Sequence, residues 1–280
     1  MAASTYTRGE LLGQGSYASV YLGTDSNGIR VALKIRSIKQ SRLDIAAENK
    51  EPRRSQYIAS NLAFIKQQVD KEAEVLRRIN SDYVIKYIET IVEEISVTMI
   101  TEFVEGSELT STRVAPYQID VAQDLIRGLH DIHRCGIIHC DIKSDNILVS
   151  QRERGWTVKY LDFGLARYSH EQTSQGTLMY TAPEILHKDL STDFKVDIYS
   201  LGVVLFELFH HSLPGGSYSS EGLTLKERLR AKQDVVRRIR HGILERSHSG
   251  SQIIDHIIDS MLSFEAIDRP LTGDLLRSFA

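Results

Sequence analysis

The hydrophobic pattern changes its period once along the chain, near residues 102–108. Before this point, β-branched and aromatic residues alternate with polar ones in short runs such as ELLGQGSYASVYLGT, IRVALKIRSI and ISVTMITEFV, which is typical of strands. After it, stretches such as YQIDVAQDLIRGLHDIH carry apolar residues at helical spacing. The sequence therefore predicts a small lobe rich in antiparallel strands, followed by a larger and mostly helical lobe.

One helix is expected inside the β-rich part. Between about Ser60 and Ile79, apolar residues recur at helical spacing opposite a polar face. The segment before it, residues 36–58, is polar and contains Pro52, so it predicts an inserted or mobile connection. It also contains basic residues, which could form a docking site for an anion. Because runs of charged residues are more often simply exposed to solvent, we favour a solvated loop.

Composition narrows the classes of function. A chain of 280 residues with 41% hydrophobic content can bury a sizeable core. The formal net charge of −3 gives no global basic field, so we expect no nucleic-acid partner. Cys135 and Cys140 fit neither a disulfide framework nor a zinc site with paired CxxC spacing, which indicates free thiols.

The amino terminus and the hydropathy predict no membrane segment. MAASTYTRGE lacks the apolar stretch of a secretory signal, and no window approaches the roughly 18 apolar residues of a membrane span. We therefore expect an intracellular protein, cytoplasmic or nuclear. An effector delivered by a dedicated secretion machine is an open alternative, because it would also lack an apolar signal sequence.

Two features of the β-rich part suit a polyphosphate ligand. The turn LGQGSYASV joins two expected strands, and Gly13 and Gly15 would let the main chain lie over phosphates without Cβ obstruction. Lys34 ends the run VALK, where alternation turns it away from Leu33 and Ile35, so it needs an anionic partner. Glu72 is the best candidate partner, because it shares a face of the expected helix with Leu76.

These features, together with HCDIKSDN at residues 139–146 and Asp162-Phe163-Gly164, resemble the eukaryotic-type protein kinase family. The resemblance runs from about Gly9 to Pro270, and its separated motifs occur in the family's order. It implies an α+β, bilobal fold and a single kinase domain over residues 1–280. The small lobe would comprise residues 1–104, with 36–58 as an insertion, and the helical lobe residues 105–280.

The resemblance also implies roles for individual residues. Lys34 would contact the α- and β-phosphates of ATP and pair with Glu72, while Asp162 and Asn146 would hold Mg²⁺. Asp141 would orient the acceptor hydroxyl and take its proton. The other residues expected to bind the nucleotide are Gly13, Gly15, Val20, Ala32, Thr101, Glu102, Val104, Glu108 and Leu148.

Two features favour serine and threonine as acceptors. Lys143, two residues after Asp141, is similar to the lysine that stabilises the transferring phosphoryl group in serine/threonine kinases. The segment GTLMYTAPE resembles the same branch and would bring Thr177 close to Asp141. Its Glu184 would form a buried ion pair with Arg269.

The chain departs from the family pattern at two places. Ala18 replaces the third glycine of the phosphate turn, which should change little. Cys140 replaces the arginine that precedes the catalytic aspartate and binds a phosphate on the activation segment, which makes this a non-RD variant with HCD in the catalytic loop. Phosphates at Ser169, Thr173 or Ser174 should therefore contribute little to activity.

The interpretation that follows is a serine/threonine protein kinase that uses ATP and Mg²⁺, acts on protein substrates and does not depend on activation-segment phosphorylation. A pseudokinase scaffold that binds nucleotide is one alternative, although Lys34, Asp141, Asn146 and Asp162 are all present. A kinase of small molecules on the same fold is another, and the GTLMYTAPE segment argues against it.

Overall fold

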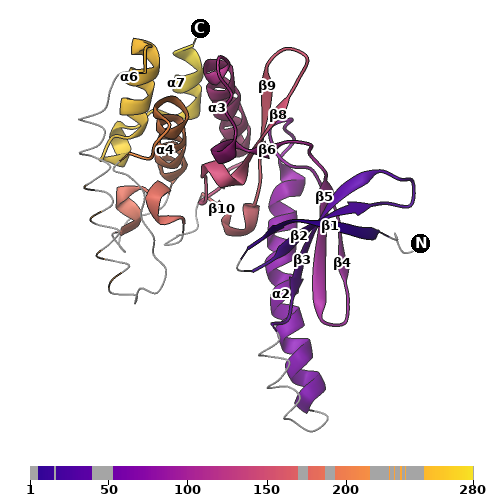
Figure 1. Cartoon of the computed structure of the whole chain (residues 1–280). Helices are drawn as coiled ribbons and strands as arrows, with labels where there is room; N and C mark the ends of the chain where they lie inside the picture. Colours follow the sequence, from indigo (N-terminus) through magenta and orange to yellow (C-terminus); the bar gives the residue numbers. More distant parts are fainter. Residues whose placement is uncertain are drawn as a thin grey trace. The chain divides into compact units, whose positions relative to one another are not determined.

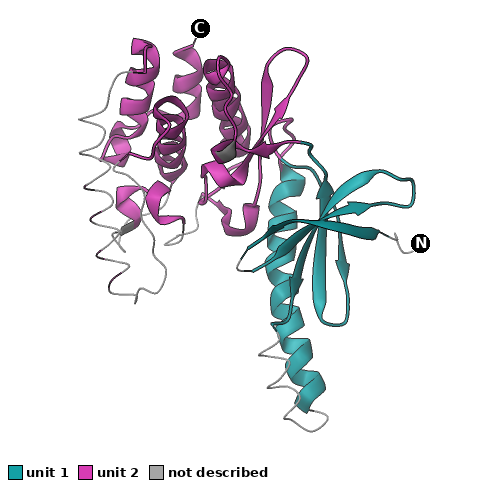
Figure 2. Cartoon of the chain, viewed as in Figure 1, with its two compact units in different colours: residues 1–78, 85–105 teal, residues 79–84, 106–280 magenta. Residues whose placement is uncertain are grey.

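The computed structural model describes residues 6–15, 17–39, 53–169, 176–186, 193–214 and 249–279, together with Glu227, Arg230, Asp234 and Arg237. The chain divides into two compact units (Figure 2). Unit 1 comprises residues 1–78 and 85–105, and unit 2 comprises residues 79–84 and 106–280. Unit 1 is a sheet with one helix and unit 2 is mostly helical, so the expected α+β class is confirmed.

Unit 1 is built on a five-stranded antiparallel sheet in the order β1-β2-β3-β5-β4. Its strands are β1 (Thr7–Gln14), β2 (Ser19–Thr24), β3 (Arg30–Ser37), β4 (Tyr87–Val92) and β5 (Ser96–Glu102). Asp25 closes the turn between β2 and β3, because its Oδ1 accepts hydrogen bonds from the backbone N–H groups of Asn27 and Ile29 at 2.8 Å. The hairpin expected at Asn27-Gly28 is thus present, and Gly28 has a φ of 79°.

The two faces of β3 contact different parts of unit 1. Val31 and Leu33 are buried against Ile100 of β5 in an apolar cluster on one face. Because side chains alternate along a strand, Lys34 and Arg36 project from the other face. Both reach a residue of helix α2 (Arg53–Arg78), which contacts β3, β4 and β5.

Helix α2 begins earlier than the sequence indicated (Figure 1). Residues 53–58 are helical, and residues 36 and 37 belong to β3, so the connection expected over 36–58 is shorter at both ends. The first turns of α2 are largely exposed and carry no apolar stripe, so the hydrophobic pattern gave no sign of a helix there. Residues 40–52 lie outside the described residues, and the insertion itself stays a prediction.

Helix α4 (Lys195–His210) lies at the centre of the described helices of unit 2 and is the most apolar of them. Nearly every residue of α4 from Val196 to Leu208 is buried. Helix α4 contacts α3 (Gln118–Arg134) and α6 (Gln252–Met261), and α3 contacts α7 (Thr272–Arg277). Among the described helices, none is both long and apolar enough to cross a membrane.

Short strands and turns of 3-10 helix complete unit 2. Strands β6 (Ser107–Glu108), β8 (Ile147–Gln151) and β9 (Trp156–Tyr160) form one small sheet, and β7 (Ile137–Ile138) pairs with β10 (Arg167–Tyr168). The 3-10 turns are η1 (Leu109–Ser111), η2 (Ser144–Asn146), η3 (Phe163–Leu165), η4 (Leu178–Tyr180), η5 (Pro183–Leu186) and η6 (Ala266–Asp268). These short elements carry the loops that hold the polar residues of the site.

The units differ from the expected lobes, 1–104 and 105–280, at residues 79–84. This segment belongs to unit 2, where the Tyr83 carbonyl accepts a hydrogen bond from the Tyr160 N–H at 2.8 Å and Ser81 donates to Asp131 at 2.6 Å. Sequence patterns gave no sign of this exchange, because it depends on pairing with a segment about 75 residues further on. The single domain over 1–280 stays a prediction.

Gly128 on α3 is required by packing. A Cβ added there would lie 2.7 Å from the Cβ of Tyr83 and 2.8 Å from the ring of Tyr160, which is fully buried. We expect Gly128→Ala to lower the free energy of unfolding by about 1–2 kcal/mol, because overpacking outweighs the gain in helix propensity.

Urea unfolding with far-ultraviolet circular dichroism measures this change. Gly273→Ala on α7 is the matched control, since its added Cβ would meet nothing closer than 3.9 Å. The control should be neutral or stabilising. Equal behaviour of the two variants would contradict the packing argument.

Candidate active site

The end of β1 and the turn after it contain glycines that packing does not explain. A Cβ added at Gly13 would meet no heavy atom within 4 Å, and one at Gly15 would meet only the Ala18 carbonyl oxygen at 3.7 Å. The turn is closed by a hydrogen bond from the Gly15 N–H to that same oxygen at 2.9 Å. Close approach of a ligand to the backbone is therefore a better explanation of these glycines than tight packing.

A buried carboxylate on α2 is held by two cations on β3. Glu72 Oε1 accepts from Lys34 Nζ at 2.7 Å, and Oε2 accepts from Arg36 Nη2 at 2.7 Å. The Glu72 side chain is 1% exposed, so each of its oxygens needs a partner inside the protein. The structure brings Lys34 and Glu72 together as expected, and it adds Arg36. Alternation places Arg36 on the same face as Lys34, but no local pattern shows that it reaches Glu72.

The other residues of unit 1 that were expected to bind the nucleotide lie on its strands or directly after them. Val20 is the register partner of Lys34 across β2 and β3, and Ala32 is the register partner of Thr101 across β3 and β5. Glu102 follows Thr101 and is fixed to Lys86 by two hydrogen bonds, one through its N–H at 2.9 Å and one through Oε1 at 3.0 Å. Val104 follows in the segment after β5.

In unit 2, the residues around Asp141 form one hydrogen-bonded cluster. Asp141 Oδ1 accepts from the N–H of Thr177 at 3.1 Å and from its hydroxyl at 2.7 Å. Asn146 Nδ2 donates to the Asp141 carbonyl at 2.9 Å and to Oδ2 at 3.0 Å. The Lys143 ammonium lies 4.0 Å from Oδ2. The structure thus brings together Asp141, Lys143, Asn146 and Thr177.

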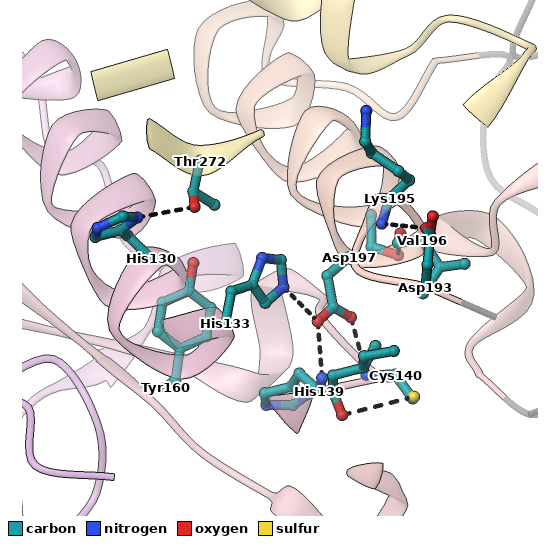
Figure 3. A network of polar contacts seen from close by, with 12 residues as sticks. His130, His133, His139, Cys140, Tyr160, Asp193, Lys195, Val196, Asp197 and Thr272 are labelled. Carbon is teal, nitrogen blue, oxygen red and sulfur yellow. Dashed lines mark hydrogen bonds and ion pairs between the residues drawn. The ribbon is translucent and has the colours of Figure 1, made fainter. Parts of the chain in front are cut away.

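A fully buried carboxylate holds the loop that contains His139 and Cys140 (Figure 3). Asp197, near the start of α4, accepts hydrogen bonds from the backbone N–H groups of His139 at 2.7 Å and Cys140 at 2.9 Å. Its Oδ2 also lies 3.0 Å from Nε2 of His133 on α3. Cys140 has a φ of 66°, a left-handed conformation that costs a residue with a side chain about 1–2 kcal/mol. The bond to Asp197 helps to offset this cost.

Asn146 and Asp162 offer oxygen ligands from adjacent backbone segments. The Asn146 carbonyl accepts from the N–H of Leu161, the residue before Asp162, at 2.9 Å. Both hydrogen bonds of the Asn146 amide nitrogen go to Asp141, which leaves the amide oxygen as the acceptor end. A carboxylate and an amide oxygen suit Mg²⁺. Elsewhere in the described ranges, no group of three or more His, Cys, Asp or Glu residues forms a metal site.

Glu108 and Leu148 also lie in unit 2. They are register partners across β6 and β8, and Leu148 is two residues after Asn146. The structure therefore groups the expected residues in two sets. Unit 1 carries Gly13, Gly15, Val20, Ala32, Lys34, Glu72, Thr101, Glu102 and Val104, and unit 2 carries Glu108, Asp141, Lys143, Asn146, Leu148, Asp162 and Thr177.

A buried ion pair anchors the segment that follows Thr177. The two outer nitrogens of Arg269 donate to the two Glu184 oxygens at 2.6 and 2.8 Å. The Arg269 side chain is 0% exposed, and its guanidinium also donates to the carbonyls of Ser263, Phe264 and Lys195. The pair expected from the resemblance is therefore present and fully hydrogen-bonded.

The sequence analysis did not predict a second hydrogen-bonded cluster, which lies next to the loop that contains Asp141. Glu207 on α4 accepts from the Tyr180 hydroxyl at 3.0 Å and from the Ser144 hydroxyl. Burial, and next the Glu207 carboxylate, raise the pKa of Tyr180 well above its usual value, so its hydroxyl stays a donor. Ser144 and Glu207 also line a cavity of about 510 Å³.

Comparisons with known proteins agree with this arrangement. The family model described as "Protein kinase domain" matches residues 6–278. "Probable serine/threonine-protein kinase SIS8" of Arabidopsis thaliana is 29% identical over 95% of this chain and 25% of its own length. "Probable serine/threonine-protein kinase 2" of Plasmodium falciparum is 31% identical over 73% of this chain and 38% of its own length.

A further relative, "CBL-interacting serine/threonine-protein kinase 13" of Arabidopsis thaliana, is 31% identical over 75% of this chain and 40% of its own length. This chain therefore spans less than half the length of each of these curated relatives. The similarity therefore applies only to the aligned part of each relative, and not to the rest of its length.

The Glu184–Arg269 pair gives a test of how the segment is anchored. We expect Glu184→Ala to lower the free energy of unfolding by about 3–5 kcal/mol, because it leaves the buried Arg269 charge without its carboxylate. Glu184→Leu combined with Arg269→Met should recover part of the loss, since no charge is then buried alone. Urea unfolding measures both variants, and a single variant as stable as the wild type would refute the anchoring role.

Proposed function

The chain belongs to the protein kinase domain family, and from this premise we propose that it transfers the γ-phosphoryl group of ATP to serine and threonine hydroxyls of protein substrates. The observation that carries the proposal is the environment of Asp141. Its carboxylate is held on one oxygen by Thr177 and on the other by Asn146, so it is oriented before any substrate arrives. A pre-oriented base lowers the reorganisation needed during proton transfer.

The proposed part of unit 1 is to bind the nucleotide. Lys34 would contact the α- and β-phosphates, with Glu72 fixing the ammonium in place. The main chain at Gly13 and Gly15 would approach the phosphates, where no side chain obstructs them. In unit 1, the adenine would be contacted by Val20, Ala32, Thr101 and main-chain groups of Glu102 and Val104. In unit 2, Leu148 is a proposed adenine contact and Glu108 a proposed nucleotide contact.

The proposed part of unit 2 is to hold the metal and perform the transfer. Asp162 and Asn146 would bind Mg²⁺, which when bound neutralises charge on the phosphate oxygens. Asp141 would accept the proton of the acceptor hydroxyl, and Lys143 would stabilise negative charge on the phosphoryl group. Thr177 would keep Asp141 oriented.

Serine/threonine specificity rests on Lys143 and Thr177 together. Both lie within reach of the Asp141 carboxylate, at 4.0 and 2.7 Å. The relatives named above are described as serine/threonine kinases, which supports the same acceptor class. Protein rather than small-molecule substrates are favoured by the anchored segment that ends in Glu184, which would serve as a platform for an acceptor peptide.

We further propose that activity does not depend on phosphorylation of the activation segment. Cys140 stands where an arginine would pair with such a phosphate, and its buried thiol, which donates to the Ile138 carbonyl at 3.7 Å, carries no positive charge. The Asp197 carboxylate supports the loop through the backbone of the same residue. The loop would therefore keep its conformation without a phosphate.

A nucleotide-binding scaffold is the alternative function. Its usual signature would be the loss of a residue needed for transfer, and Lys34, Asp141, Asn146 and Asp162 are all present. The hydrogen bonds around Asp141 also favour the enzyme, because a scaffold has no need of an oriented base.

Phosphoryl transfer is tested by incubating wild-type protein and Asp162→Asn with Mg·ATP and a basic protein substrate, and mapping the products by mass spectrometry. We expect phosphoserine and phosphothreonine with the wild type and a loss of roughly 10²-fold or more with Asp162→Asn. Asp70→Asn is the matched control, because Asp70 lies exposed on α2, where it pairs with the equally exposed Lys66. Mg·ATP binding without transfer by the wild type would favour the scaffold.

Independence from activation-segment phosphorylation is tested with Ser169→Ala, Thr173→Ala and Ser174→Ala combined in one variant. Thr173 and Ser174 lie outside the described residues, so this expectation comes from the sequence. The variant should keep most of the initial rate, because Cys140 offers no cation to a phosphate. Phosphatase-treated wild type is the control. Near-complete loss of activity in either sample would overturn the proposed independence.

A further inference from the structure

Two segments of unit 2 are tied together at two points that have the same spacing. The loop that contains Asp141 carries Ser144 three positions later, and the segment that contains Thr177 carries Tyr180 three positions later. Asp141 accepts two hydrogen bonds from Thr177, which is the first tie. The second tie runs through Glu207 on α4, because its Oε2 accepts from the hydroxyls of both Ser144 and Tyr180.

The backbone of Glu207 is fixed, but its side chain has room to turn. Its neighbours Phe206 and Leu208 are buried, so this part of α4 belongs to the core. The Glu207 side chain is half-buried and lines a cavity of about 510 Å³. A glutamate side chain has several rotamers, and the cavity leaves space for those that turn away from Tyr180. The hydrogen bonds that Glu207 accepts therefore decide its direction.

Ser144 is placed to select the rotamer of Glu207 that meets Tyr180. Ser144 is 1% exposed, so its hydroxyl is shielded from water and needs an acceptor inside the protein. A hydrogen bond to an ionised carboxylate is stronger than one between neutral groups. The loop that carries Ser144 is itself fixed, because Asn146 donates two hydrogen bonds to Asp141. Ser144 therefore holds the Glu207 carboxylate from a fixed position.

The two ties set the geometry between the segment and the loop. Ser200 and Arg269 hold the segment to the helical part of unit 2, through the Tyr180 carbonyl and the Glu184 carboxylate. The tie at Thr177 sets the distance from the segment to the loop. Because Tyr180 ends the 3-10 turn η4 that follows Thr177, a second tie there sets the angle between them as well.

We propose that Ser144 is a positioning residue for phosphoryl transfer: through Glu207 and Tyr180, its hydroxyl fixes the angle between the segment and the loop. The inference rests on the proposed function and deepens it, because the segment is the proposed platform for the acceptor peptide. With the second tie intact, the acceptor hydroxyl would lie at the Asp141 carboxylate. A displacement of about 1 Å at the reacting atoms can cost roughly 10²-fold in rate, so a small rotation of the platform is enough to slow transfer.

The test is the rate of a single turnover of the full chain at saturating Mg·ATP, with enzyme in excess over the basic protein substrate, together with the Kd for Mg·ATP. Ser144→Ala should lower the single-turnover rate by roughly five- to twentyfold, because nothing then directs Glu207 toward Tyr180. The Kd for Mg·ATP should stay within about twofold of the wild type, because Asn146 keeps its own hydrogen bonds to Asp141. A general distortion of the loop would instead change both quantities.

A second variant tests whether the tie acts as one unit. Tyr180→Phe removes the hydroxyl at the other end of the tie and keeps the ring, so it should lower the single-turnover rate by a similar factor. Because either change breaks the same tie, Ser144→Ala combined with Tyr180→Phe should lie within about twofold of the slower single variant. Tyr180→Phe also provides the test if Ser144→Ala alone does not fold.

Ser81→Ala is the matched control. Ser81 is also a buried serine of unit 2 whose hydroxyl donates to a carboxylate, that of Asp131, at 2.6 Å. Its removal should leave the single-turnover rate within about twofold of the wild type, even where thermal stability falls as much as in Ser144→Ala. An equal loss of rate in Ser81→Ala and Ser144→Ala would overturn the inference.

The outcomes separate the inference from the proposed function. Equal single-turnover rates of wild type and Ser144→Ala would overturn the inference and leave the proposed function standing. A double variant whose loss is the product of the two single losses would also overturn it, as would weakened Mg·ATP binding that accounts for the slower rate. A wild-type protein that binds Mg·ATP but transfers no phosphoryl group to the protein substrate would overturn both.

Discussion

The hydrogen bonds of the buried Asp197 carboxylate are the interactions that hold the loop around Asp141. The carboxylate lies at 0% exposure near the start of the most apolar helix of unit 2, and it accepts two backbone N–H groups of the loop. An ionised group in such a place is tolerated only when its oxygens are fully hydrogen-bonded, and His133 supplies a further contact. The loop that contains Asp141 is thereby tied to the core of the unit. The left-handed backbone of Cys140 is held by the same bonds.

Unit 1 also buries a carboxylate whose two oxygens both have partners. Glu72 accepts hydrogen bonds from two side-chain cations on β3, whereas Asp197 accepts them from backbone N–H groups of a loop. In each unit the buried carboxylate ties one element to another: Glu72 holds α2 to β3, and Asp197 holds the loop to α4.

Local signals in the sequence were enough for the regular elements that pack an apolar face on a core. The alternation in VALKIR places Lys34 on the face opposite Leu33, and the structure has that strand at Arg30–Ser37. The apolar spacing from Val69 to Leu76 identified the part of α2 that packs on the sheet. It failed for residues 53–58, because this largely exposed first part of the helix carries no apolar stripe. Arg36 was overlooked for a related reason: a basic residue in a strand is usually solvated, and its burial depends on where the helix packs.

The sequence by itself determined the family, the order of the strands and helices, and the residue types available for phosphoryl transfer, because these depend on local periodicity and on motifs of fixed spacing. Tertiary structure alone decided that residues 79–84 pack with Tyr160, that Ser144 and Tyr180 share Glu207, and that Glu72 has two cations. Each of these facts joins residues far apart in the chain. The hydrogen bonds and charges involved exist only once folding has excluded water from between them, so no local pattern encodes them.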